Sequence, residues 1–231
     1  DNAFAELAQH PAPEAAAPTG QPCGEFIGTS EPMQQLYSRI RSVSRSMATV
    51  FITGESGTGK EIAAQTIHNL SNRADKPFIP LNCGAIPPNL LESEVFGHLK
   101  GSFQGAIADK LGAAAAADGG TLFLDEICEM DLNLQTKLLR FLQSSNIQPV
   151  GATRARKVNV RIICATNRNP LTEVRRGRFR EDLYFRLQVV PIHLPPLRDR
   201  GDDIIQIAQH SLANLSAVER RSFARLRPSV Q

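Results

Sequence analysis

The feature that most constrains the fold is a glycine-rich segment between an apolar run and a helical pattern. The segment reads Gly54-Glu55-Ser56-Gly57-Thr58-Gly59-Lys60, after Val50-Phe51-Ile52 and before the helical pattern Lys60–Leu70. A strand, a G-x-x-x-x-G-K loop and a helix in this order are typical of a phosphate-binding loop, because the glycines let backbone N–H groups point at phosphate oxygens. A chance glycine-rich turn, the alternative, would not require the flanking strand and helix. We therefore expect ATP to bind at this loop.

The residue after the lysine departs from the general motif. Ser or Thr is usual there, since its hydroxyl ligates Mg²⁺, but this chain has Glu61. We include Glu61 among the cofactor-binding residues by its position. The metal must then be held by another side chain.

Two carboxylates follow an apolar run, and one of them is the expected metal ligand. The run Thr121–Leu124 predicts a buried strand, and Asp125 and Glu126 follow it. Asp125 is suited to coordinating Mg²⁺, directly or through water, and Glu126 to orienting and polarising the attacking water. Acidic residues are common at strand ends, so the pair indicates triphosphate hydrolysis only together with the phosphate loop.

Short apolar runs alternate with amphipathic stretches along most of the chain, which predicts an α/β fold with helices around a parallel sheet. The expected strands are Thr49–Thr53, Phe78–Asn82, Thr121–Leu124, Val160–Thr166 and Val189–Leu194. The expected helices are Glu31–Val43, Lys60–Leu70, Asn89–Phe96, Asp131–Gln143 and Asp202–Leu215, with a short one at Ala113–Ala117.

The composition predicts three regions. Residues 1–24 are rich in Ala and Pro without apolar periodicity, which indicates a linker. Residues 25–195 form the α/β core, and residues 196–231 begin a helical lid with an apolar stripe of Ile204, Ala208, Leu212 and Leu215. The chain starts without Met and ends without a completed packing partner, so we expect further sequence on both sides.

Charge, apolar runs and cysteines indicate which partners and which cellular location to expect. A net charge of +3 is too small an excess to indicate direct DNA contact. No apolar run approaches the ~18 residues that span a bilayer, and no signal pattern opens the chain, so we expect a cytoplasmic protein without a membrane partner. Cys23, Cys83, Cys128 and Cys164 lack metal-ligand spacing, and we expect them to be reduced, most of them as small buried hydrophobes.

Further motifs carry a family resemblance. They are Asn82-Cys83, Glu94-Val95-Phe96-Gly97-His98, Gly101–Ala106, Ala165-Thr166-Asn167, Phe179-Arg180-Glu181-Asp182-Leu183 and Leu194-Pro195-Pro196-Leu197-Arg198. With these motifs, roughly residues 26–210 resemble the central ATPase domain of sigma-54-dependent bacterial transcription activators, which are AAA+ proteins of the NtrC type. Within that family, Cys128-Glu129-Met130-Asp131 and Leu134–Leu142 look most similar to the quorum-sensing response regulators of two-component systems.

The resemblance implies a three-layer αβα P-loop fold with a five-stranded parallel sheet. It also implies a hexameric or heptameric ring with ATP between subunits, whose hydrolysis remodels the closed complex of the sigma-54 RNA polymerase holoenzyme. Promoter or enhancer DNA would be contacted only through a helix-turn-helix domain, which this chain lacks together with the W-P-G-N-V-R-E part of the lid. A kinase or helicase is disfavoured, because Trp is absent and only two Tyr could stack on bases.

The resemblance also implies roles for polar residues after strands. Asn82 would be the switch that restrains Glu126 and senses the γ-phosphate, and Thr166 and Asn167 would be the sensor. Ordinary strand-end hydrogen bonding is the alternative for the two asparagines.

Two arginines match the family's pair that reaches into the neighbouring subunit's site, where positive charge stabilises the transferred phosphoryl group. They are Arg180 and Arg186. On one regular helix they would point about 120° apart, so the helix must end or bend between them if both serve one site. Without the resemblance they would read as solvated surface arginines.

The loop Gly101-Ser102-Phe103-Gln104-Gly105-Ala106 matches the family's sigma-54 contact loop, which reads G-A-F-T-G-A. Its glycines and Phe103 suit an exposed aromatic tip on a flexible base. Gln104 replaces the family's threonine, on which sigma contact relies. The alternative function is therefore a nucleotide-controlled regulatory or oligomerisation module that does not engage sigma-54.

Overall fold

A computed structural model describes Cys23 and residues 26–219 of the 231-residue chain. Most of the expected linker and the last residues of the expected lid therefore lie outside the described residues. The central sheet has the order β2-β5-β8-β1-β9. Its strands are β1 (Val50–Thr53), β2 (Phe78–Asn82), β5 (Thr121–Asp125), β8 (Arg161–Thr166) and β9 (Val190–His193), and all neighbours are parallel.

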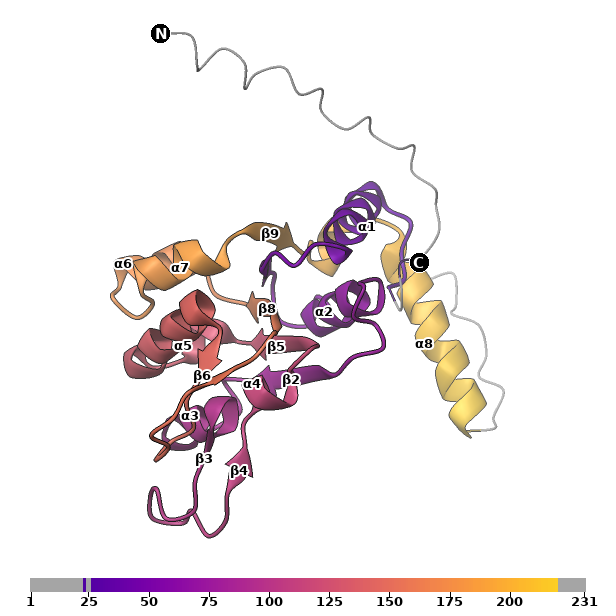
Figure 1. The fold of residues 1–231 in the computed structure, drawn as a ribbon. Coiled ribbons are helices and arrows are strands. Elements are labelled where there is room, and N and C mark those ends of the chain that lie inside the picture. The colour runs from indigo at the N-terminus through magenta and orange to yellow at the C-terminus, as the bar shows by residue number, and fades with distance from the viewer. Residues whose placement is uncertain (1–22, 24–25, 220–231) are drawn as a thin grey trace, which may run out of the picture.

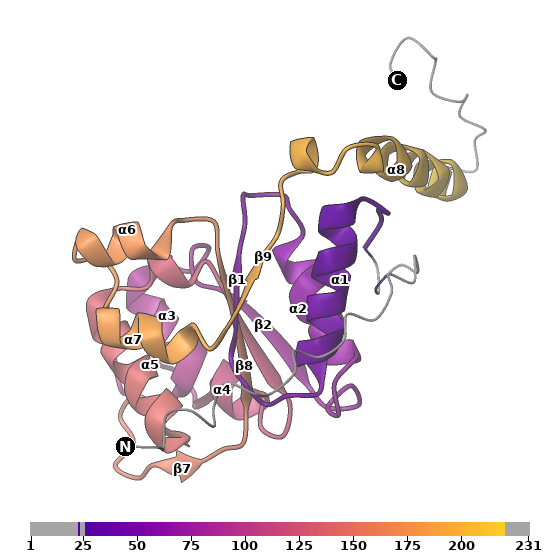
Figure 2. The same cartoon turned by 90° about the horizontal axis from the view of Figure 1, so that it is seen from above.

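Helices cover both faces of this sheet, so the predicted three-layer α/β fold is confirmed (Figures 1 and 2). Helices α1 (Glu31–Ser44) and α2 (Lys60–Asn69) pack on one face. The other face carries α3 (Pro88–Phe96), α4 (Ala113–Ala116), α5 (Leu132–Ser144) and α7 (Glu181–Leu187). The short α6 (Pro170–Arg175), the 3-10 turns η1 (Ile127–Glu129) and η2 (Leu197–Asp199), and α8 (Asp203–Glu219) complete the chain.

The central strands are apolar on both sides because helices cover both. All six residues of β8 are buried, as are the first four of β5. The edge strand β2 is only partly buried and alternates in exposure. Continuous apolar runs are typical of strands in the middle of a parallel sheet, which explains why the sequence locates them well.

Two small antiparallel hairpins were not predicted. One pairs β3 (Gly97–His98) with β4 (Lys110–Leu111), and the other pairs β6 (Asn146–Ile147) with β7 (Arg156–Lys157). The β3–β4 hairpin extends away from the central sheet (Figure 1). Val150 joins the hairpins, since its N–H donates to the carbonyl oxygen of Gly97 at 2.9 Å and its own carbonyl accepts from Leu99 N–H at 3.0 Å. Two-residue strands carry no recognisable apolar alternation.

Helix α8 is attached to the core by a buried carboxylate. Asp203 is 1% exposed and accepts hydrogen bonds from Thr29 N–H and Ser30 N–H, at 2.7 and 3.0 Å, and from the Ser30 hydroxyl at 2.6 Å. The apolar stripe predicted for this helix is not buried in the described part of the chain, because Ile204 and Leu215 are 51% and 57% exposed. The polar contact, rather than the stripe, fixes the start of α8.

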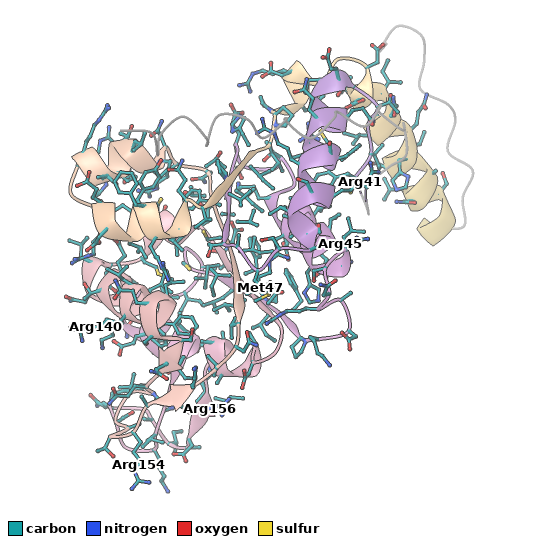
Figure 3. All side chains as sticks on the ribbon, turned by 45° about the horizontal axis from the view of Figure 1, so that its top comes forward. Arg41, Arg45, Met47, Arg140, Arg154 and Arg156 are labelled. Atoms are coloured by element: carbon teal, nitrogen blue, oxygen red, sulfur yellow. The ribbon has the colours of Figure 1, made fainter. Side chains whose placement is uncertain are left out.

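The arginines labelled in Figure 3 lie at separate places on the molecule. In Figure 3, Arg41 and Arg45 lie along α1, whereas Arg154 and Arg156 lie at the opposite end of the molecule, around the β6–β7 hairpin. This distribution agrees with the mild net charge. Among the described helices, none is long and apolar enough to cross a membrane.

Candidate nucleotide-binding site

The phosphate loop joins β1 to α2 and has the backbone geometry that its glycines permit. Gly57 and Gly59 have φ values of +80° and +94°, a region that favours glycine. Lys60 begins α2, is 7% exposed, and donates from Nζ to the carbonyl oxygens of Gly54 and Glu55 at 3.2 Å each. The lysine ammonium therefore lies within the loop, where phosphate oxygens would meet it.

Two arginines that follow β9 hold the outer side of the loop, and neither was predicted as a site residue. Arg198 binds both carboxylate oxygens of Glu55 at 2.6 and 2.8 Å, and this pairing lowers the pKa of Glu55. Arg200 is 5% exposed and donates to the carbonyl oxygen of Thr58 at 2.8 Å. The L-P-P-L-R motif is the sequence signal for Arg198, and it ends two residues before Arg200.

A cavity of about 330 Å³ lies between the loop and these arginines. Its lining consists of Glu55, Ser56, Gly57, Thr58, Pro196, Leu197, Arg198, Arg200 and Ile207. A larger cavity of about 460 Å³ lies between α3, α5 and the β6–β7 hairpin and includes no residue of the phosphate loop. The smaller cavity adjoins the phosphate loop, whose backbone N–H groups are suited to phosphate oxygens. Glu61 is exposed on the first turn of α2.

The two carboxylates lie where β5 ends. Asp125 is its last residue, and its Oδ1 accepts from Glu126 N–H at 2.9 Å. Glu126 has φ 52° and ψ 46°, a left-handed conformation that costs a non-glycine residue about 1 kcal/mol or more. Strain of this kind is concentrated at functional sites. Asn167 N–H, from the end of β8, donates to Glu126 Oε2 at 3.4 Å.

The sheet order explains why these elements meet. Strand β8 lies between β1 and β5, so the phosphate loop and Asp125 start from strand ends about 10 Å apart, two strand spacings. Thr166 and Asn167 leave the sheet between them. The carboxyl ends of parallel strands form the common ligand site of such sheets.

Asn82 lies in register with Asp125, but its side chain is used locally. Its Oδ1 accepts from Gly84 N–H at 2.9 Å and from Ala85 N–H at 3.1 Å. This is the strand-end bonding that the sequence left open as the alternative. Its role as a switch stays a prediction.

The side chain of Thr166 also forms a local hydrogen bond. It is buried, and its Oγ1 accepts from Arg168 N–H at 3.1 Å.

Arg180 and Arg186 lie on the opposite face of the sheet from α2. Arg180 has extended backbone and precedes the first residue of α7, so the two arginines do not share one regular helix. Arg180 binds Asp182 at 2.7 and 3.0 Å, and Arg186 donates to the carbonyl oxygen of Leu142 at 3.0 Å. Within the described residues, no hydrogen bond or ion pair joins either arginine to the phosphate loop, Asp125 or Glu126.

The loop Gly101–Ala106 is closed at its base and has a tip different from the predicted one. Gly101 N–H donates to the carbonyl oxygen of Ala106 at 2.8 Å. The ring of Phe103 is only half-exposed and packs edge-on against His98, with centroids 5.0 Å apart. The exposed tip residues are Gln104 and Gly105. The aromatic ring prefers the neighbouring imidazole because burial of its apolar surface is favourable.

The four cysteines are free and buried, as predicted. Burial raises the pKa of Cys83 to about 12 and that of Cys128 to about 11, so their thiols stay protonated. Within the described residues, no three His, Cys, Asp or Glu side chains are grouped to hold a metal ion.

The sheet order, the phosphate loop and the acidic end of β5 define a P-loop nucleoside triphosphatase domain of the AAA+ class. The family model described as "Sigma-54 interaction domain" matches residues 26–193, and the chain belongs to this family.

Proteins similar in sequence and in structure support this assignment. The chain is 58% identical to the luminescence regulatory protein LuxO of Vibrio campbellii over 94% of its own length, and 48% identical to the response regulator PilR of Pseudomonas aeruginosa over 89%. It spans 48% and 46% of those relatives. The structure of NtrX from Brucella abortus in complex with ATP superimposes with a TM-score of 0.83 and 37% identity, covering 88% of this chain and 44% of NtrX.

Proposed function

We propose that this chain is the ATP-hydrolysing module of a sigma-54-dependent transcription activator, which remodels the closed complex of the sigma-54 RNA polymerase. The observation that carries the proposal is the contact of Asn167 N–H with Glu126, because it joins a carboxylate fit for catalysis to the end of β8, the strand that lies next to the one leading into the phosphate loop. The similarity to NtrX, whose structure contains ATP, supports the choice of nucleotide.

The chemistry follows from the site. Backbone N–H groups of the loop and the ammonium of Lys60 bind the β- and γ-phosphates. Asp125 has one carboxylate oxygen bonded to Glu126 N–H and the other available, and one protein carboxylate with phosphates and waters is a donor set that suits Mg²⁺. When bound, the metal would supply charge neutralisation at the phosphates. Glu126 orients and polarises the attacking water.

The arginines act between subunits in this proposal. Arg180 and Arg186 lie on the other face of the sheet from α2 and form no described bond with their own phosphate loop, so they would reach the nucleotide of the next subunit in a hexameric or heptameric ring. Residues 25–195 would form the ATPase core and residues 196–231 the beginning of its lid, after a linker at 1–24. Arg198 and Arg200 already join the start of this lid to the phosphate loop.

A second candidate function is a nucleotide-controlled regulatory module that does not engage sigma-54. The exposed side chain of Gln104 at the tip of the contact loop favours it, since that position departs from the family threonine. The two candidates share the ATPase chemistry and differ only in what the loop contacts.

The discriminating experiment measures ATP-dependent open-complex formation by the sigma-54 polymerase with the full chain and with Gln104→Thr. Open complexes with the parent chain support the activator. ATP turnover without open complexes would contradict it, and a gain of opening in Gln104→Thr alone would establish the second candidate.

A further inference from the structure

The backbone before α7 is held by a buried glutamine of α5. Gln135 is 0% exposed, and its Nε2 donates to the carbonyl oxygen of Arg178 at 2.9 Å while its Oε1 accepts from Arg180 N–H at 2.8 Å. One amide side chain thus binds the backbone on both sides of Phe179, as a neighbouring strand would. Phe179 itself is 2% exposed, so the segment has little freedom to shift.

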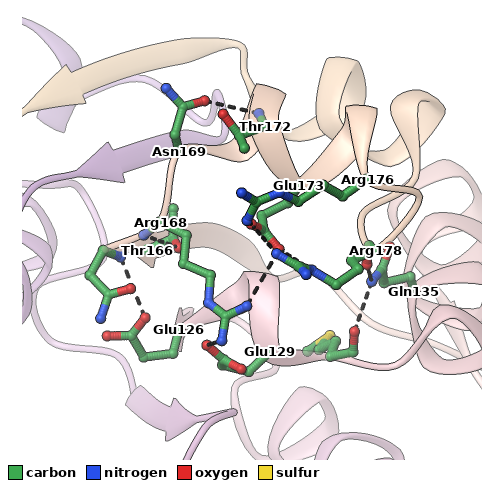
Figure 4. A network of polar contacts seen from close by, with 12 residues as sticks. Glu126, Glu129, Gln135, Thr166, Arg168, Asn169, Thr172, Glu173, Arg176 and Arg178 are labelled. Carbon is green, nitrogen blue, oxygen red and sulfur yellow. Dashed lines mark hydrogen bonds and ion pairs between the residues drawn. The ribbon is translucent and has the colours of Figure 1, made fainter.

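A buried glutamate holds the same segment from α6 (Figure 4). Glu173 is 3% exposed and binds the guanidinium of Arg178 through both carboxylate oxygens, at 2.6 and 2.7 Å. Its carbonyl oxygen also accepts from Arg178 N–H at 3.0 Å and from Phe179 N–H at 3.2 Å. A bidentate pair between planar groups fixes orientation as well as distance.

The contacts of Glu173 with this segment are connected to the strand ends that carry Glu126 and Thr166. Arg168, two residues after Thr166, contacts Glu173 at 3.4 Å and Glu129 at 2.5 Å (Figure 4). Glu129 ends the 3-10 turn that follows Glu126. A continuous set of ion pairs therefore runs from the ends of β5 and β8 to Arg178, two residues before Arg180.

Arg180 needs such support because its neighbours do not provide a regular helix. Its backbone is extended, it precedes α7, and its guanidinium is partly exposed. An arginine that must stabilise charge in another subunit loses its effect if its backbone shifts by even about 1 Å.

We propose that Gln135 and Glu173 are positioning residues that fix Arg180 for use at the neighbouring subunit's nucleotide. This inference rests on the proposed between-subunit hydrolysis. Neither residue touches the nucleotide, so both act only through the segment Arg178–Arg180.

The test uses mixed assemblies of the full chain. Lys60→Ala subunits should bind ATP at least about a hundredfold more weakly but supply Arg180, whereas Arg180→Ala subunits should bind nucleotide but lack the arginine. Each is inactive alone, and their mixture should recover ATP hydrolysis where an intact nucleotide site meets an intact arginine. Glu173→Gln is then added to one kind of subunit at a time.

With Glu173→Gln in the Lys60→Ala subunits, recovered turnover should fall roughly tenfold or more. With Glu173→Gln in the Arg180→Ala subunits, turnover should change by less than about twofold. Arg178→Gln changes an exposed residue and repeats the test if Glu173→Gln does not fold. Arg175→Gln, which changes an exposed charge at the end of α6, is the matched control and should change neither mixture.

The outcomes separate the inference from the function on which it rests. Equal loss in both arrangements would mean that Glu173 supports stability or assembly. A larger loss with Glu173→Gln in the Arg180→Ala subunits would mean that it serves its own subunit's site, and no loss in either arrangement would mean that it positions nothing. Each of these results overturns the inference, while the recovered activity still supports between-subunit hydrolysis. A mixture that recovers no activity, although the parent chain hydrolyses ATP, would overturn the between-subunit arrangement itself.

Discussion

The Nζ atom of Lys60 lies 3.2 Å from the carbonyl oxygen of Gly54, so the first residue of α2 reaches back across the whole phosphate loop. The ammonium is held by backbone carbonyls rather than by a carboxylate. Phosphate oxygens carry more negative charge than carbonyls and would bind it more strongly.

Lys60→Ala should therefore weaken ATP binding by roughly a hundredfold or more, since a charge-assisted contact to two phosphates is lost. Glu126→Gln keeps the shape of the side chain and should leave the dissociation constant within about twofold while turnover falls roughly 10²- to 10⁴-fold. Titration with a fluorescent ATP analogue and a phosphate-release assay measure the two effects. Similar losses of binding in both variants would contradict the assigned roles.

Ser102 of the contact loop has a buried hydroxyl without a hydrogen-bond partner in the described structure. Ser102→Ala removes this group without changing the packing, so we expect stability to rise by about 1 kcal/mol and the Tm by about 2–4 °C. Thermal unfolding followed by circular dichroism measures the change. A lower Tm would show that the hydroxyl is bonded in solution.

Gly151→Ala is the contrasting variant at the same contact. A Cβ there would lie 2.7 Å from Ser102 Cβ, and Gly151 has a φ of +82°. We expect this variant to lower the Tm, and unchanged stability would mean that the two loops do not touch.

The parts of the fold that the sequence predicts are those that local patterns determine. The strand Phe78–Asn82 was placed with both ends correct, and the other central strands within one residue, because each is centred on a short apolar run. The hairpins were missed, as were α6 and α7, because short elements are held by contacts with distant residues. The phosphate loop was predictable for the same reason as the strands, since its spacing is local.

The supporting residues of the site were not predictable in this way. Gln135 looks like any polar position of an amphipathic helix, and Glu173 like any charged residue before a turn. Their function depends on the segment Arg178–Arg180, 43 or more residues from Gln135 and five from Glu173, turning back onto both. Buried polar side chains are informative only once burial is known.

Arg161 should contribute to stability and not to nucleotide binding. It is 1% exposed, at the opposite end of β8 from Thr166, and donates to the carbonyl oxygens of Ser44 and Val43 at 2.7 and 2.9 Å. Both carbonyls lie at the end of α1; that of Val43 also accepts from Ser46 N–H at 3.0 Å, so Arg161 adds a second bond there. Burial lowers the pKa of Arg161 to about 10.

Arg161→Met removes the guanidinium from both carbonyls, of which Val43 keeps its bond from Ser46 N–H, and it also removes a buried charge. We expect a net loss of about 2 kcal/mol and a Tm lower by about 4–8 °C. Arg156→Gln, which changes an exposed arginine, is the matched control and should stay within about 0.5 kcal/mol. Thermal melts with and without ATP measure both. A loss of ATP affinity in folded Arg161→Met would be inconsistent with a purely structural role.

Glu173 should make stability depend on acid. Hydrogen bonds from Arg178 hold the pKa of Glu173 at about 2, below its ordinary 4.5. Between these values the unfolded chain binds the proton more readily than the folded one. The contribution of Glu173 to stability is therefore complete above pH 4.5 and is lost as the pH falls towards 2.

Glu173→Gln carries no titrating group at this position. The difference in Tm between the parent and this variant should therefore be largest near neutral pH and shrink as the pH falls below 4.5. Thermal melts at a series of pH values measure this difference, and the effects of the other carboxylates cancel because both proteins contain them. A difference in Tm that stays constant down to pH 3 would show that pairing with Arg178 does not lower the pKa of Glu173.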